Sequence, residues 1–125
     1  MRRPLKIMRM VLAVLLALAL PVHTASAHPR LLRATPAAES HVAGPPREIA
    51  LSFNEPVSVA LSRLTLLDAA KRAVTLDSLR PAPGDAKTLT AKVLGAPRPG
   101  RYTVKWQAGG ADGHPMRGEY SFVVD

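Results

Sequence analysis

Three side chains of this sequence are of types that together can hold a transition metal: His28, Asp112 and His114. Asp112 and His114 stand two positions apart in a glycine-rich segment that runs from Gly110 to Pro115. On an extended backbone, residues i and i+2 point the same way, so this spacing aims a carboxylate and an imidazole at one point. The simpler alternative is that Asp112 caps a turn while His114 is an ordinary surface residue.

His28 gains its importance from the residues before it, which have the composition of a secretory signal peptide. Residues 1–27 open with basic and no acidic side chains, continue with an apolar run from Val11 to Leu20, and end in Ala25-Ser26-Ala27. These are the three parts of such a leader, and the apolar run is shorter than the roughly 20 residues that span a bilayer. We expect cleavage after Ala27, which leaves residues 28–125 outside the cytoplasm; an uncleaved N-terminal anchor is the alternative.

As the first residue of the cleaved chain, His28 would offer two nitrogens, its α-amine and its imidazole Nδ1. The α-amine has a pKa near 8, so its proton is easily displaced by a metal at neutral pH. Pro29 has no N–H, so the chain cannot wrap the ion with deprotonated backbone amides, and the other ligands must come from elsewhere in the fold. With Asp112 and His114 the set is three nitrogens and one oxygen, which suits one tetragonal Cu(II) ion per chain; Zn(II) would demand a tetrahedron.

Few other residues could carry chemistry. Glu55 ends a predicted strand just before Pro56, where it is either a further carboxylate for the metal or an exposed strand-end glutamate. His41 lies in a polar segment, which we expect to be an exposed loop. Met116 is the one methionine after the leader, so a thioether-rich Cu(I) site cannot be built. The sequence also has no nucleophile elbow, zinc-protease motif or phosphate loop, so we expect no enzyme.

Composition narrows the class of protein further. The 98 residues from His28 to Asp125 suffice for one domain. They contain no cysteine, so neither a disulfide nor a thiolate metal site is possible. Loss of four basic residues with the leader lowers the formal charge from +8 to about +4, and the remaining Lys and Arg are spread along the chain. Nucleic-acid binding proteins cluster these residues, so we expect no nucleic-acid partner. We also expect a monomer.

Short alternating runs separated by Pro and Gly predict the scaffold that positions these residues. Alternation of period two indicates strands with one buried face, and the pattern predicts an all-β, seven-stranded Greek-key sandwich or barrel of the immunoglobulin-like kind. The predicted strands are 29–34, 47–55, 62–67, 73–76, 88–93, 101–107 and 119–124. Tyr102 follows a Pro-Gly turn, where it is either a tyrosine corner or an ordinary core residue. Trp106 is predicted to be in the core and, being near Asp112 in sequence, close to the metal.

Several segments together resemble the CopC family of periplasmic copper-resistance proteins. The resemblance covers nearly all of residues 28–125, and its most specific parts are the histidine at the cleavage site and the D-x-H-P-x-x-G segment. The matching segments are His28-Pro29-Arg30-Leu31, Ala34-Thr35-Pro36-Ala37, Phe53-Asn54-Glu55-Pro56, Pro99 to Trp106, and Asp112 to Gly118.

This resemblance implies a small Greek-key β-domain that binds Cu(II) in the periplasm for copper homeostasis or resistance. It implies as ligands the amine and imidazole of His28, the carboxylate of Asp112 and the imidazole of His114, with a weaker claim for Glu55. Some members carry a methionine-rich Cu(I) site, but the corresponding stretch here, 67–83, has neither methionine nor histidine. An inner-membrane protein of the CopD type is the implied partner. The other hypotheses are a copper oxidase with a histidine-brace-like site and a metal-free immunoglobulin-like interaction module.

Overall fold

The computed structural model describes residues 28–125, and the predicted signal peptide, residues 1–27, lies outside the described residues. Every regular element between residues 28 and 125 is a β-strand, and no helix in that range could cross a membrane. The strands are β1 (Leu31–Thr35), β2 (His41–Val42), β3 (Glu48–Phe53), β4 (Ser58–Leu67), β5 (Ala73–Val74), β6 (Arg80–Ala82), β7 (Asp85–Lys92), β8 (Gly100–Gly109) and β9 (Pro115–Val124).

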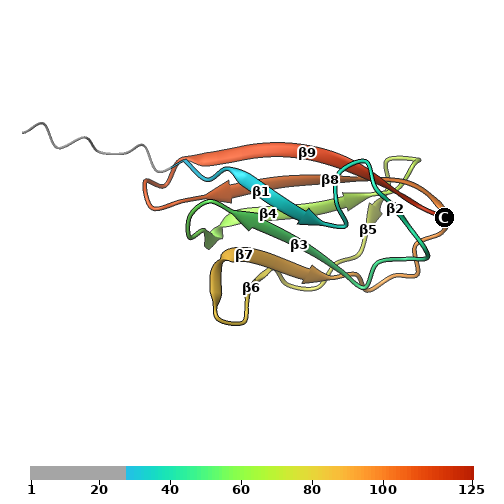
Figure 1. Cartoon of the computed structure of the whole chain (residues 1–125), viewed down its shortest axis with the longest axis horizontal. Helices are drawn as coiled ribbons and strands as arrows, with labels where there is room; N and C mark the ends of the chain where they lie inside the picture. The colour runs from blue at the N-terminus through green and yellow to red at the C-terminus, as the bar shows by residue number, and fades with distance from the viewer. Residues whose placement is uncertain (1–27) are drawn as a thin grey trace, which may run out of the picture.

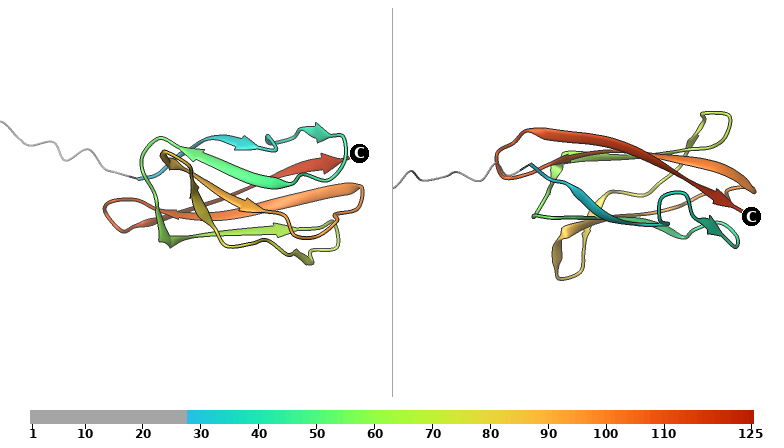
Figure 2. Two further views of the ribbon diagram at one scale, coloured as in Figure 1. Left: turned by 90° about the horizontal axis from the view of Figure 1, so that it is seen from below. Right: turned by 45° about the horizontal axis from the view of Figure 1, so that its top comes forward.

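The strands form two sheets that face each other as a sandwich (Figures 1 and 2). One sheet has the order β1-β3-β7-β6 and the other the order β2-β9-β8-β4-β5. All pairs are antiparallel except β2 with β9. The chain changes sheet five times, between β1 and β2, β2 and β3, β3 and β4, β5 and β6, and β7 and β8. Such repeated crossing between two sheets is typical of an immunoglobulin-like Greek key. The predicted all-β sandwich is therefore confirmed.

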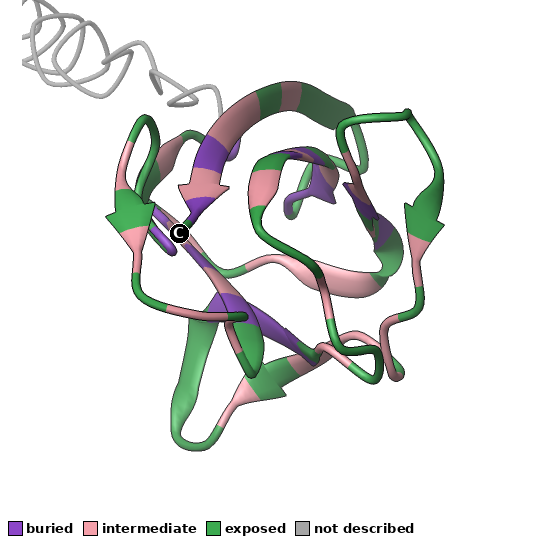
Figure 3. Cartoon of the chain, turned by 90° about the vertical axis from the view of Figure 1, so that its right-hand side faces the viewer, coloured by how far each residue is buried: buried purple, intermediate pink, exposed green. Residues whose placement is uncertain are grey.

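The core lies between the sheets and is built from alternate residues of the long strands. In β3, Ile49, Leu51 and Phe53 are buried while the residues between them are not, as the alternation predicted. Figure 3 shows the same alternation as bands of buried and exposed residues along the strands. The other strands add aliphatic and aromatic side chains to the same cluster: Leu66, Leu89, Tyr102, Val104, Ala108, Phe122 and Val124.

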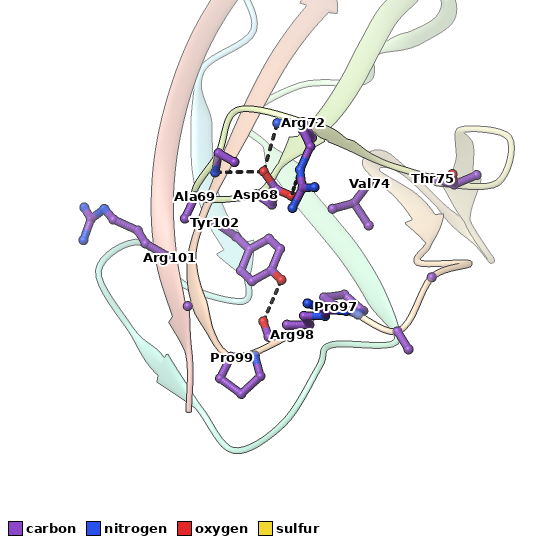
Figure 4. Close-up of a pocket in the computed structure, with 14 residues that line it drawn as sticks. Asp68, Ala69, Arg72, Val74, Thr75, Pro97, Arg98, Pro99, Arg101 and Tyr102 are labelled. Atoms are coloured by element: carbon purple, nitrogen blue, oxygen red, sulfur yellow. Dashed lines mark hydrogen bonds and ion pairs between the residues drawn. The ribbon is translucent and has the colours of Figure 1, made fainter.

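Tyr102 closes the turn that leads into β8. The residue is 4% exposed, and its ring stacks on Phe122 with ring centroids 5.8 Å apart. Its hydroxyl donates a hydrogen bond of 2.6 Å to the carbonyl oxygen of Arg98, four residues earlier (Figure 4). Burial raises the pKa of this hydroxyl above its ordinary value, so it stays a donor at neutral pH. Of the two readings of this residue, the tyrosine corner is therefore confirmed.

Two strands were not predicted, which is why the described part of the chain has nine strands rather than seven. β2 has two residues and β6 has three, so neither shows a period-two pattern. His41, expected in a loop, begins β2, although its predicted exposure is confirmed. Pro81 interrupts β6, which a sheet tolerates because β6 is an edge strand.

Candidate metal centre

His28 is held at one end of the sandwich by the two residues that follow it. Pro29 is fully buried. The Arg30 N–H donates to the Asn54 side-chain oxygen at 2.6 Å, and the Asn54 N–H donates back to the Arg30 carbonyl at 3.1 Å. Asn54 directly follows β3, so this pair of hydrogen bonds ties Arg30, and with it residues 28 and 29, to the end of a core strand. The three residues before β1 therefore have a defined path, and the position of His28 is set by the fold.

Asp112 and His114 lie at the same end, in the connection between β8 and β9. The Gly113 N–H donates to the Gly110 carbonyl at 3.1 Å, and the His114 N–H donates to Asp112 Oδ1 at 3.0 Å. Gly113 has a φ of +75°, a conformation that favours glycine. The segment is thus a tight turn, and the expectation of an extended backbone between Asp112 and His114 was wrong. The turn still brings both side chains together, because Asp112 bonds back onto it.

The three predicted ligand side chains meet at this end although His28 and Asp112 are 84 positions apart in the sequence. Asp112 Oδ2 lies 3.2 Å from His28 Nδ1 and 3.4 Å from His114 Nδ1. One ligand atom from each residue lies within 4.8 Å of the others. The side chains are 46%, 28% and 77% exposed for His28, Asp112 and His114, respectively, so an ion can reach them from solvent.

The Asp112 carboxylate is kept ionised by its surroundings. The hydrogen bond from the His114 N–H lowers the pKa of Asp112 below its ordinary value, and contacts with the imidazoles of His114 and His28 lower it further. Partial burial opposes this shift without reversing it. Asp112 therefore presents a negative oxygen at neutral pH, and a cation need not displace a proton from it.

These spacings fit a first-row transition metal. Bonds of about 2.0–2.2 Å to nitrogen and oxygen place adjacent ligands about 3 Å apart and opposite ligands about 4 Å apart. The two contacts of Asp112 Oδ2, 3.2 and 3.4 Å, are close to the adjacent spacing. Small side-chain movements would therefore suffice to place two imidazoles and one carboxylate around one ion. A mixed nitrogen and oxygen set of this kind suits Cu(II).

Glu55 lies outside this cluster of His28, Asp112 and His114. Its Oε1 atom is buried and has no hydrogen-bond partner among the described residues. A buried polar atom without a hydrogen-bond partner lowers the stability of the fold, so a cation or a hydrogen-bond donor bound at Glu55 Oε1 would be stabilising. It is therefore not the exposed strand-end residue of the simpler alternative, while its predicted role at the metal stays a prediction.

Trp106 packs where it was predicted to, against the core. Its ring meets Phe53 edge-on with centroids 5.3 Å apart and lies over Gly118, its cross-strand partner in β9. Its predicted proximity to the metal stays a prediction.

His41 lies in β2, where its Nδ1 is 2.9 Å from Asp125 Oδ1. The C-terminus and β2 lie at the end of the molecule away from residue 28 (Figure 1), so His41 is not part of the cluster.

A cavity of about 530 Å³ lies at that opposite end, between the β4–β5 hairpin and the segment before β8 (Figure 4). β8 separates it from the Asp112 turn by ten residues, about 33 Å of strand. The cavity is lined by Asp68–Ala70, Arg72, Val74, Thr75 and residues 95–102, none of which is a methionine or a histidine. Thioether ligands for Cu(I) are therefore absent from its walls.

Comparison with known proteins gives the family. The CopC domain model matches residues 31–125, most of the chain. This chain belongs to the CopC family. A copper resistance protein C of Escherichia coli is 36% identical to this CopC-family chain over 108 residues, which are 81% of this chain and 84% of that protein.

Solved structures agree with the family assignment. The crystal structure of CopC from Methylosinus trichosporium OB3b has a TM-score of 0.72 at 32% identity, covering 78% of this chain and 94% of that one. PcoC, a methionine-rich copper resistance protein from Escherichia coli, has a TM-score of 0.71 at 32% identity, covering 79% of this chain and all of PcoC. This CopC-family chain differs in having a single methionine, Met116, in its described part.

The structure adds one residue, Asn54, that was not singled out from the sequence, and it gives Pro29 a second role. Asn54 accepts a hydrogen bond from the Arg30 N–H, and Pro29, directly after His28, is fully buried, so both residues hold the backbone next to His28 in place. Pro29 had been noted only for the N–H that it lacks. The position of Asn54 directly after a strongly alternating run was the available signal, because polar residues at strand ends often bond to a neighbouring backbone.

Proposed function

We propose that this CopC-family protein binds one Cu(II) ion per chain in the periplasm and serves copper homeostasis or resistance by buffering, carrying or delivering the ion. The observation that carries the proposal is the convergence of His28, Asp112 and His114 at one end of the sandwich, with ligand atoms within 4.8 Å of one another. The names of the relatives, copper resistance protein C among them, support copper as the cargo.

The proposal assigns four ligand atoms and depends on cleavage after Ala27. Cleavage frees the α-amine of His28, which with Nδ1 of the same residue closes a chelate ring on the ion. Asp112 supplies an oxygen and His114 a nitrogen. Glu55, with its buried oxygen lacking a partner, is proposed to support the site from beside the ligands. A membrane protein of the CopD type is the proposed recipient or donor of the ion.

We propose cargo binding rather than oxidation chemistry because of the carboxylate. A hard anionic oxygen stabilises Cu(II) relative to Cu(I), and Asp112 is held ionised next to both imidazoles. Such a site resists the reduction that a copper oxidase of the histidine-brace type requires.

The test uses the full chain, expressed in a Gram-negative host so that export and processing occur. Mass spectrometry should give a protein that begins at His28. Titration with Cu(II) should give a 1:1 complex, and electron paramagnetic resonance should give a tetragonal signal with three nitrogen ligands. Fluorescence of Trp106, the single tryptophan, should be quenched on binding.

Variants separate the ligands from the rest of the surface. His28→Ala and His114→Ala should each weaken Cu(II) binding by a factor of about 100 or more, because each removes a bonded donor while loss of an outer partner alone costs 10–100-fold. His41→Ala is the matched control and should bind as the parent does. A mature chain with one added residue before His28 should also bind weakly, because its α-amine is displaced. Tight 1:1 binding that survives both His28→Ala and His114→Ala would overturn the proposal.

A further inference from the structure

The outer face of the β2-β9-β8-β4-β5 sheet collects most of the net positive charge of residues 28–125. This basic face and the loop residues in contact with it carry six cations against three anions. The strands of the other sheet, with the loop before β6, carry four cations, Arg33, Arg80, Lys87 and Lys92, against three anions, Glu48, Asp77 and Asp85. The cations of the basic face are Arg63, Lys71, Arg72, Arg101, Lys105 and Arg117, and its anions are Glu39, Asp68 and Glu119. Spread along the sequence, these cations are gathered by the strand order.

The three anions are already engaged, which leaves specific cations free. Ion pairs join Arg72 to Asp68, Arg101 to Glu39, and Lys105 to Glu119, the last at 4.0 Å. The surplus is Arg63, Lys71 and Arg117, for which no ion pair to a carboxylate occurs among the described residues.

Arg63 and Arg117 share one row across the sheet. Both are cross-strand partners of Gln107, so they flank it on β4 and β9 at about 10 Å from each other, two strand spacings. Gln107 accepts a hydrogen bond from Arg117 Nε at 3.0 Å, which orients that guanidinium and leaves its NH2 groups available. The next outward row pairs Gly109 with Pro115, which flank the Asp112 turn. The two arginines therefore stand beside the proposed copper end.

A hollow of about 320 Å³ opens further along the same face. Its lining includes Lys71, Arg101 and Lys105, with Thr103 and Ser121 between them, and also Asp68 and Glu119, which are paired with Arg72 and Lys105. The two hydroxyls lie 3.2 Å apart and are bonded to each other. A carboxylate entering this hollow would meet the Lys71 ammonium, for which no ion pair occurs among the described residues, beside Arg101 and Lys105, which already have carboxylate partners. An ammonium group is a donor that binds acidic side chains.

We propose that the basic face docks a protein partner with an acidic surface, with Arg63 and Arg117 as its main contacts. Three strands of ten residues give a face of about 500 Å², which corresponds to the small interface of a transient complex. Leu61, 42% exposed, lies over Gly109 beside the arginine row and supplies an apolar contact.

A protein is favoured over a lipid surface because of what the face lacks. Adsorption to a bilayer combines basic residues with several apolar side chains that insert. Among the described residues, the outward positions of β8 from Arg101 to Gln107 and of β9 from Arg117 to Ser121 are polar or charged, and Leu61 on β4 is the one large hydrophobic side chain of the face that is exposed. Alternation of cations with engaged carboxylates on a flat sheet suits complementary ion pairs, which orient a partner and accelerate its encounter.

The test uses the exported, processed protein and a fluorescein-labelled deca-glutamate peptide, with binding followed by fluorescence anisotropy at about 20 mM salt, where screening is weak. Arg63→Glu/Arg117→Glu should raise the Kd about tenfold or more, because it places like charges opposite the peptide. Lys87→Glu/Lys92→Glu, on β7 of the other sheet, is the matched control with the same change in net charge and should raise the Kd less than about threefold. Amide shifts on peptide addition should map to β4, β8 and β9.

Equal weakening by both double variants would show that net charge alone drives binding and would overturn the proposal, as would the absence of peptide binding. Vesicles of phosphatidylcholine with one quarter phosphatidylglycerol form a second arm. Vesicle binding that the face variant abolishes, without peptide binding, would assign the face to a membrane and overturn the protein partner. If the double Glu variant does not fold, Arg63→Gln/Arg117→Gln should still weaken peptide binding about threefold or more, and unchanged binding would refute the role of the arginines.

Discussion

Gly118 in β9 lies directly under the Trp106 ring, so its replacement by alanine tests how this core side chain is packed. A Cβ atom added at Gly118 would lie 2.5 Å from Trp106 Cζ2, 2.7 Å from Cε2 and 2.9 Å from Nε1. Carbon atoms in contact prefer about 3.5–4.0 Å, so the ring would have to move by about 1 Å. The edge-on contact of the ring with Phe53 opposes that movement.

The magnitude follows from two opposing effects. Overpacking of a well-packed core costs about 1–3 kcal/mol, while the loss of glycine flexibility in the unfolded chain returns about 0.5–1 kcal/mol. We expect Gly118→Ala to lower the free energy of unfolding by about 1–2 kcal/mol. For a domain of this size that lowers the Tm by about 4–16 °C.

The assay is thermal unfolding followed by circular dichroism and by the emission of the single tryptophan. Gly95→Ala is the matched control, because its added Cβ would lie 3.7 Å from Val74 Cγ1, an ordinary contact, and its backbone φ suits alanine. The control should unfold within about 0.5 kcal/mol of the parent. If Gly118→Ala unfolds at the same temperature as Gly95→Ala, the close packing of Trp106 on the β9 backbone is refuted.

Three further predictions concern single side chains. Tyr102→Phe removes the hydroxyl of the tyrosine corner and should lower the free energy of unfolding by about 0.5–1.5 kcal/mol, measured by urea denaturation; an unchanged midpoint would show that the bond contributes nothing. The hydrogen bond from the Thr88 hydroxyl lowers the pKa of Asp85 below its ordinary value of 3.8, so this carboxylate stabilises the fold above about pH 4 and loses that contribution as the pH falls through its lower folded pKa. Thr88→Val should raise the Asp85 pKa in an NMR titration, and no rise would contradict the assigned cause. His41→Ala should speed amide exchange at Asp125 while leaving global stability within about 0.5 kcal/mol, because its ion pair lies on the exposed surface.

The long strands could be predicted because their alternation covers several periods. Ile49, Leu51 and Phe53 mark one face of β3, and Tyr102, Val104 and Trp106 mark one face of β8. β2 and β6 could not, because strands of two and three residues depend on the neighbour with which they pair rather than on their own pattern.

The candidate site was predicted from chemistry, and the structure explains its geometry differently. The residue types of His28, Asp112 and His114 suggested one metal site. The three side chains meet because the end of β3, which holds residues 28–30, and the turn between β8 and β9 lie at the same end of the sandwich. The conformation of the Asp112 turn could not be read from the i, i+2 spacing, because a left-handed Gly113 reverses the chain there. The basic face could not be predicted from the sequence either, because Arg63 and Arg117 come close only through the pairing of β4 and β9 with β8.

The cluster joins the first described residue to a turn near the last strand, and this has a consequence for folding. An ion held by His28 and Asp112 closes a loop of 84 residues, and in the chain-entropy view a cross-link of that length restricts the unfolded chain by about 4–5 kcal/mol. In a protein without cysteine, copper would thus be its one long-range staple. His28 is far in sequence from the Asp112 turn, so the ligands come together only after the strands between them have assembled. The ion would therefore bind a chain that has already folded and stabilise it, rather than start the folding of the sandwich.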